Sequence, residues 1–129
     1  MVSERLSYLP DNLPDYRPFP PANERAAWQA LPQRVKDRFL QAGEAGLSKS
    51  IGPLPLSLWL DFLRTGQRTP WEDAYFSRRA RLCALVCAEC VEHTGRFMDA
   101  IADTVWAICE ESAWQLPAHN SYIRDTPQL

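Results

Sequence analysis

Two long helical patterns separated by a two-residue break constrain the fold of this chain most strongly. The first begins at "TPWE", where Thr69 suits a helix cap, Pro70 suits the first helical position and Glu72 completes a capping box. It extends to about residue 93, and the second pattern covers residues 96–112. A break as short as Thr94-Gly95 predicts an antiparallel αα-hairpin.

The inner faces of this hairpin can be assigned from the spacing of apolar residues. In the first helix "LCALVCAECV" is apolar on nearly every side except at Glu89, which predicts burial on most sides. Glu89 should then pair with an arginine of "SRRAR" or face a cavity, and we favour the ion pair. In the second helix the predicted stripe is Phe97, Ile101, Val105 and Ile108.

Three shorter helices are expected before the hairpin. Asn23 suits the N-cap of "ERAAWQAL", and Pro32 opens a helix that should stop at Gly46, with a stripe of Val35, Phe39 and Ala42. A loop follows, and then Pro55 opens a helix that ends at Gly66. No strand pattern is convincing, so the fold class is all-α, with about five helices in antiparallel hairpins.

The N-terminal segment is different because prolines crowd it. Five of the 11 prolines lie in the first 21 residues, which excludes helix there. We expect residues 1–22 to form an extended arm and residues 23–129 to form one helical domain, the size of which suits a chain of 129 residues.

Charge and hydropathy exclude several classes of function. A formal net charge of −2 gives neither the basic field of a nucleic-acid-binding protein nor an electrostatic attraction to anionic membranes. No apolar run is long enough to span a bilayer, and the N-terminus lacks the apolar core of a signal peptide. We therefore expect a cytoplasmic protein with no nucleic-acid or membrane partner.

Three of the four cysteines share one side of the first hairpin helix, namely Cys83, Cys87 and Cys90. They could ligate a metal, but no second C-x-x-C pair accompanies them, and His93 is the only histidine nearby. We interpret them as reduced, buried core residues and predict no metal and no cofactor.

The most reactive residue types gather after the second helix. His119 can act as a base or an acid, the Asn120 amide can donate to a carboxylate, and Tyr122 can pass a proton. Elimination from a uronic acid needs these actions: the carboxylate is neutralised, the proton alpha to it is removed, and the leaving oxygen is protonated. The alternative is a polar loop with a capping asparagine.

The residues just before this cluster have two interpretations each. Trp114 could stack on a sugar ring or fill the core, and the core interpretation is favoured. Glu110 falls on the polar face of the helix, whereas Glu111 lies nearer the apolar stripe and can turn inward. The "SRRAR" arginines could meet an anionic ligand, but a solvated helix face is favoured.

Several stretches resemble the N-terminal helical part of heparinase II/III-like proteins, which are polysaccharide lyases of the α/α-toroid group. The resemblance covers residues 22–122 and is most specific in "LDFLRTG", "YFSRRARL", "AECVEHTGRFMD" and "WAICEESAWQLPAHN". It implies a partial toroid of helical hairpins and β-elimination on an acidic, uronate-containing glycan. His119, Asn120 and Tyr122 would then be the catalytic residue types, with Trp114, Glu110 and Glu111 contacting substrate or orienting its neighbours.

The resemblance also sets limits on what this chain does alone. Family members contain several hundred residues, including further hairpins and a β-sandwich region. We therefore expect the chain to be a fragment that is inactive by itself. The alternative is a non-catalytic helical module that binds a carbohydrate or another protein, or that self-associates through faces which further hairpins would cover. A weaker third option is a thiol or metal protein.

Overall fold

The computed structural model describes residues 17–119, and every regular element in that range is helical. The elements are α2 (Arg25–Gln29), α3 (Gln33–Ser48), α4 (Leu56–Thr65), α5 (Thr69–Glu92), α6 (Met98–Cys109) and the 3₁₀ turn η1 (Pro117–His119). Residues 17–119 contain no strand, so the all-α prediction with five helices is confirmed. Residues 17–22 are neither helix nor strand, and the rest of the predicted arm lies outside the described range.

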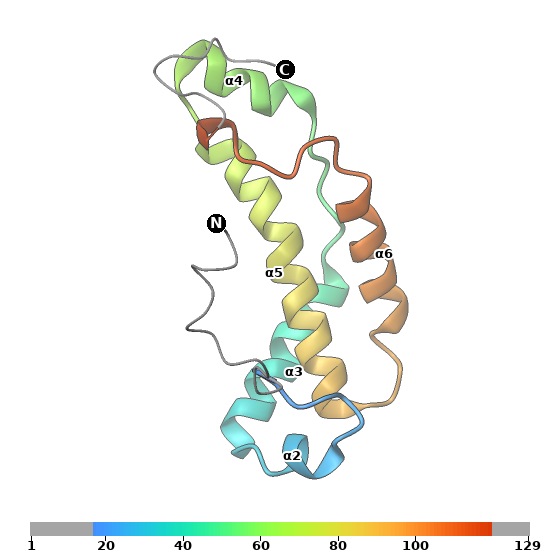
Figure 1. Ribbon diagram of the computed structural model, residues 1–129. Coiled ribbons are helices and arrows are strands. Elements are labelled where there is room, and N and C mark those ends of the chain that lie inside the picture. The colour runs from blue at the N-terminus through green and yellow to red at the C-terminus, as the bar shows by residue number, and fades with distance from the viewer. Residues whose placement is uncertain (1–16, 120–129) are drawn as a thin grey trace, which may run out of the picture.

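Helix α5 is the centre of the arrangement. Figure 1 shows α3 crossing behind the C-terminal half of α5, α6 beside α5, α2 at its C-terminal end and α4 at its N-terminal end. The predicted antiparallel hairpin of α5 and α6 is confirmed, because α6 returns beside α5 in the opposite direction. The turn uses two residues with positive φ, His93 at 60° and Gly95 at 83°, and glycine adopts this geometry without strain.

Two predicted helix starts are wrong at the cap. Glu24, not Asn23, is the residue before α2, and the Asn23 carbonyl accepts from the Arg25 amide instead. At α5 the residue before the helix is Arg68, which is already helical, so Thr69 lies inside the first turn and forms no side-chain cap. Glu72 pairs with Arg68 at 3.6 Å rather than closing a capping box.

Gly46 does not stop α3, which continues to Ser48. Instead, Gly43 and Gly46 are buried where α3 meets α5. A Cβ added at Gly43 would lie 2.3 Å from the Cβ of Ala88, so the glycine allows the two helices to approach closely. Ala42, predicted to lie on the buried stripe, is exposed.

The described residues form two separate core clusters. One contains Trp59, Trp71 and Tyr75, from α4 and the start of α5. The other contains Leu85 and Ala88 of α5 with Phe97 at the start of α6. Each cluster is small, and α5 connects them.

Helix α5 is buried on fewer sides than its composition predicts. Cys83 is exposed and Val86 is 39% exposed. The predicted core position of Cys83 is therefore wrong, while Cys87 and Cys90 are half-buried. All four cysteines are free thiols.

The stripe predicted on α6 is also partly wrong. Val105 is 42% exposed, and the fully buried residue is its neighbour Thr104. A polar residue can occupy this position because its hydroxyl donates to the Ala100 carbonyl at 2.6 Å and accepts from Arg81 Nε at 3.0 Å. Apolar periodicity alone cannot identify such a satisfied threonine.

Glu89 does not pair with an arginine of "SRRAR". Its carboxylate accepts from the backbone amides of Gly95, at 2.7 Å, and Phe97, at 3.3 Å. It thereby binds free amides at the start of α6, where a negative charge is stabilising.

No helix within residues 17–119 has both the length and the apolar character needed to cross a membrane.

Candidate functional site

The candidate site lies where the chain leaves α6 and crosses toward α4. Helix α6 ends at Cys109, earlier than predicted, and residues 110–116 follow without helical structure. In Figure 1 this segment, coloured dark orange to red, runs from the end of α6 to η1 near the start of α5. Packing between α4 and η1 holds the far end of the segment in place.

A buried carboxylate anchors the near end of the segment. The side chain of Glu111 is 1% exposed, and two consecutive arginines of α5 bind it. Arg79 Nη2 lies 2.6 Å from Oε2, and both Arg79 Nη1 and Arg78 Nη1 lie 3.1 Å from Oε1. The predicted inward turn of Glu111 is confirmed, and the predicted solvated face for "SRRAR" is wrong.

Both arginines have further partners. Arg78 donates to the carbonyls of Gly52, at 2.7 Å from Nη2, and Ala107, at 3.1 Å from Nη1. It thus joins the loop before α4, the end of α6 and Glu111. The Arg79 guanidinium lies 3.3 Å from the centre of the Tyr75 ring, a cation–π contact.

The electrostatics of Arg79 follow from these contacts. Burial acts to lower the pKa of Arg79, but the hydrogen bonds and charge of Glu111 outweigh it, so the pKa is raised. Arg79 therefore stays charged beside the Glu111 carboxylate.

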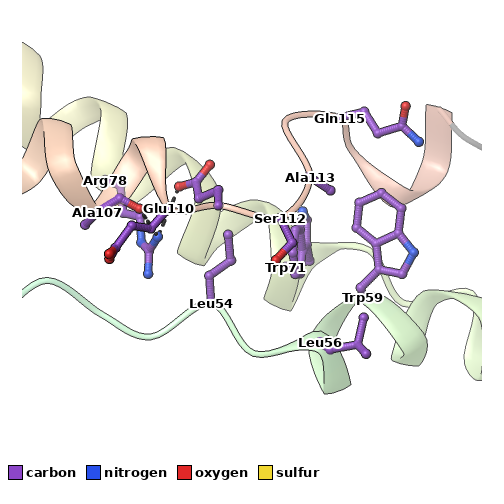
Figure 2. Close-up of a pocket in the computed structure, with 11 residues that line it drawn as sticks. Leu54, Leu56, Trp59, Trp71, Arg78, Ala107, Glu110, Ser112, Ala113 and Gln115 are labelled. Carbon is purple, nitrogen blue, oxygen red and sulfur yellow. Dashed lines mark hydrogen bonds and ion pairs between the residues drawn. The ribbon is translucent and has the colours of Figure 1, made fainter. Parts of the chain in front are cut away.

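A cavity of about 550 Å³ opens beside this cluster. Figure 2 shows it as an elongated hollow between the loop before α4 and the segment after α6. Arg78, Ala107 and Glu110 lie at one end, and Leu56, Trp59 and Gln115 lie at the other. The two ends therefore differ in character, one charged and one largely apolar.

The wall of the cavity carries a buried donor without an acceptor. Trp71 is 5% exposed, and its ring meets Trp59 edge to face at 5.0 Å. Its indole Nε1 has no hydrogen-bond partner, and within residues 17–119 it is the one buried side-chain nitrogen or oxygen in that condition. Such a group costs about 1–3 kcal/mol when it stays unsatisfied.

The predicted site residues are divided by this geometry. Glu110 and Glu111 both line the cavity, as the prediction of a cleft wall requires. Trp114 does not line it and is 63% exposed, so the favoured core interpretation is wrong. Its indole donates to the Ile108 carbonyl at 3.2 Å, and its own carbonyl accepts from the Tyr75 hydroxyl at 2.9 Å.

His119 ends η1, is exposed and does not line the cavity. Asn120 and Tyr122 lie outside the described residues. Their predicted roles therefore stay predictions.

Sequence reasoning does not indicate Trp59 and Trp71 as site residues, and for Arg78 it favours a solvated face over contact with an anionic ligand. Trp71 stands out in the sequence only as part of the capping motif "TPWE". Two tryptophans 12 positions apart on different predicted helices gave no periodic signal. The one available signal was the inward-pointing Glu111, which needs a cationic partner when buried.

The cysteine face does not form a competing site. A shallow hollow of about 490 Å³ between α3 and α5 is bordered by Cys83, Cys87 and Phe39. Within residues 17–119 no group of three or more metal-binding side chains is arranged to hold an ion. Burial, with smaller effects from Cys83 and Cys90, raises the pKa of the Cys87 thiol, which makes it a poorer nucleophile at neutral pH.

Comparison with known proteins leaves the family open: no protein-family model matches the sequence, and no curated protein matches it. The site can therefore be judged only by its own residues. An elongated cavity with a charged end, an aromatic wall and a free buried donor is suited to a polar ring compound such as a sugar.

Proposed function

We propose that this chain is the N-terminal helical part of a heparinase II/III-like polysaccharide lyase, a partial toroid that acts on uronate-containing glycans by β-elimination. The observation that supports this best is the anchoring of residues 110–119 beside a cavity. This segment carries "EESAWQLPAH", part of the most specific resemblance, and Glu111 fixes it to α5 through two arginines.

The proposed chemistry uses the residues at the end of this segment. Asn120 neutralises the uronate carboxylate, which makes the proton alpha to it more acidic. His119 removes that proton, and Tyr122 protonates the leaving oxygen. Glu110, Glu111 and Trp114 contact the glycan or orient the segment, and the rest of the cleft comes from further hairpins.

The test is near-ultraviolet absorbance during incubation with heparan sulfate, alginate and hyaluronate, because elimination creates an unsaturated uronate. The chain is compared with a form extended by the reading frame that follows it. We expect product only from the extended form, and its loss in His119→Ala and Asn120→Ala. A His93→Asn variant is the matched control, since His93 is exposed in the α5–α6 turn and asparagine tolerates its positive φ.

Absence of product from all three glycans with a folded, extended protein would contradict the lyase proposal. Product from the short chain alone would contradict the expectation that further hairpins are needed.

A specific observation favours a second candidate, a non-catalytic module that associates with a second copy of itself. Helix α6 exposes Met98, Val105 and Trp106, at 52%, 42% and 68%. Val105 and Trp106 are neighbours, and Met98 lies two turns before Val105 on the same side of the helix; exposed apolar side chains grouped on one helix are typical of an interaction surface. Sedimentation equilibrium tests this: we expect concentration-dependent dimers that Trp106→Ser weakens, while Phe76→Ser, which changes an exposed residue on α5, does not. A monomer at all concentrations removes this candidate.

A further inference from the structure

Among residues 17–119, no cation that lines the cavity beside Glu111 is free to pair with a uronate, because the one lining guanidinium, Arg78, is already bound. We propose that it binds the uncharged sugar unit of the glycan, with the ring between the loop before α4 and the segment after α6. This inference rests on the proposed function, because it assumes that the ligand is a glycan. Elimination takes place on the uronate unit of the glycan, and the cavity would hold the neighbouring uncharged unit.

Charge is the first argument. One guanidinium, Arg78, and two carboxylates, Glu110 and Glu111, border the cavity. The donors of Arg78 are directed to Glu111 and to the carbonyls of Gly52 and Ala107. Within residues 17–119 no arginine or lysine pairs with the Glu110 carboxylate. A carboxylate or sulfate on the ligand would therefore be repelled by it.

Hydrogen bonding is the second argument. The Trp71 indole N–H is buried at the cavity wall and lacks an acceptor, which a sugar hydroxyl or ring oxygen supplies. Glu110, by contrast, needs a donor, and a hydroxyl can donate as well as accept. A hydroxyl can serve either group, whereas the carboxylate group of a uronate can serve only the tryptophan and is repelled by Glu110.

Size and polarity agree with this choice. A volume of about 550 Å³ is within the range of small-molecule sites and exceeds that of one sugar ring. Leu54, Leu56 and Trp59 give the cavity an apolar wall for the C–H face of the ring. Ser112 and Gln115 add neutral polar groups along the same segment.

The test is an NMR titration that follows the indole N–H signals of the five tryptophans in ¹⁵N-labelled chain. The probes are methyl glucoside, N-acetylglucosamine and glucuronate at millimolar concentrations. We expect the neutral sugars to shift the Trp71 signal as its N–H gains an acceptor. The signals of Trp28 and Trp114, whose indoles already donate to backbone carbonyls, should stay in place.

Two variants sharpen the test. Trp71→Phe keeps a six-membered aromatic ring but removes the five-membered ring that carries the donor, and we expect neutral-sugar affinity to fall about three- to tenfold, as for loss of one hydrogen bond. Glu110→Gln should strengthen glucuronate binding relative to the neutral sugars. Phe76→Leu, on an exposed residue outside the cavity, is the matched control and should change neither.

The inference is overturned if no sugar shifts the Trp71 signal, or if glucuronate binds the unmodified chain as tightly as the neutral sugars do. Its failure differs from that of the lyase proposal. Neutral-sugar binding without any unsaturated product from the extended form would keep this site and reject the lyase. Product without neutral-sugar binding would do the reverse.

Discussion

At the scale of single residues, Glu111 has the strongest structural role in the site. Its carboxylate is almost completely buried and is satisfied by both neighbouring guanidinium groups. Those arginines also bind carbonyls of the loop before α4 and of α5 and α6. One side chain thus determines where the segment that carries the candidate catalytic residues leaves the helix.

We predict that Glu111→Ala lowers the free energy of unfolding by about 3–5 kcal/mol, because two partly buried guanidinium groups lose their counter-ion. Urea unfolding followed by circular dichroism measures this. The neighbouring Glu110 is exposed, so Glu110→Ala should cost no more than about 0.5 kcal/mol. Equal losses in the two variants would show that burial of Glu111 does not matter.

The cysteines allow a pH-dependent prediction. Burial raises the pKa of both Cys87 and Cys90, although Arg25 opposes the shift at Cys90. A raised pKa means less thiolate at a given pH, so these thiols should alkylate slowly until the pH rises above the ordinary thiol range. We expect iodoacetamide at pH 8 to modify the exposed Cys83 and Cys109 about tenfold faster than it modifies Cys87 and Cys90.

Peptide mass spectrometry over time measures each rate, and the same reaction in urea is the control, since unfolding should make the four rates similar. Faster modification of Cys87 than of Cys83 in the folded chain would contradict the prediction.

For single residues, the sequence predicted whether a side chain turns inward better than it predicted which residues that side chain contacts. The inward turn of Glu111 followed from its place near an apolar stripe. The partner arginines did not, because a basic run on a helix is usually solvated and nothing local indicates what lies opposite. The burial of Thr104 was missed for a similar reason, because it depends on a hydrogen bond from Arg81, which is distant in the sequence.

At the scale of elements, the closest packing is between α3 and α5. It depends on the absence of a side chain at Gly43, where an added Cβ would lie 2.3 Å from the Ala88 Cβ and 3.0 Å from Phe97 Cε1. We predict that Gly43→Ala destabilises the fold by about 1–3 kcal/mol, although alanine favours helix by about 1 kcal/mol.

Alanine substitutions at two other glycines serve as comparisons, with smaller expected losses of stability. Gly46→Ala meets only Leu85 atoms at 3.2 and 3.3 Å, so its loss should be smaller. Gly52→Ala meets nothing within 4 Å and should be nearly neutral. The order of thermal midpoints is the measurement, and a Gly43→Ala variant as stable as Gly52→Ala would contradict the packing argument.

The start of α6 gives a second prediction for an element. Glu89→Gln removes the charge that binds the Gly95 and Phe97 amides, and an amide can accept through only one of its two heavy atoms. We expect a loss of about 1–2 kcal/mol in the free energy of unfolding. Glu92→Gln, which weakens a surface pair with Arg96 and a hydrogen bond from the Thr94 hydroxyl, is the control and should cost less than about 1 kcal/mol. Similar losses in both would contradict a capping role for Glu89.

The number and order of the helices could be predicted because prolines and glycines mark many of the helix boundaries. Pro55 directly precedes α4, Gly66 ends it in the left-handed conformation, and Gly95 occupies the break before α6. The same rules failed at Gly46, since a glycine that ends a helix and a glycine that admits a neighbouring helix look alike in sequence. At Gly43 the role becomes clear only from the structure, where Ala88 of α5 lies directly opposite the glycine.

At the scale of the whole molecule, the two core clusters lie at opposite ends of α5 and share no buried residue. The candidate cavity belongs to the first cluster, because Trp59 and Trp71 line it. The close contact of α3 and α5 belongs to the second. A chain built in this way should open in parts, with the site end less stable than the end closed by α3.

Hydrogen exchange measured by mass spectrometry tests this division. We predict that Trp59→Ala speeds exchange in α4, in the first turns of α5 and in residues 110–119, because loss of a buried tryptophan costs about 3–5 kcal/mol at that end. Exchange in α3 and in the second half of α5 should change little. Leu85→Ala is the matched variant and should have the converse effect, speeding exchange in α3 and the second half of α5.

If instead each variant speeds exchange evenly along residues 17–119, the chain unfolds as one unit and the two clusters are energetically coupled. The connection would then be the arginines of α5, since Arg78 and Arg81 bind backbone carbonyls on both sides of the helix between the clusters. A ligand bound in the cavity would in that case stabilise α3 as well. If the two ends unfold separately, as we predict, a ligand in the cavity slows hydrogen exchange only as far as the first half of α5. Binding then orders only the segment that leads to His119.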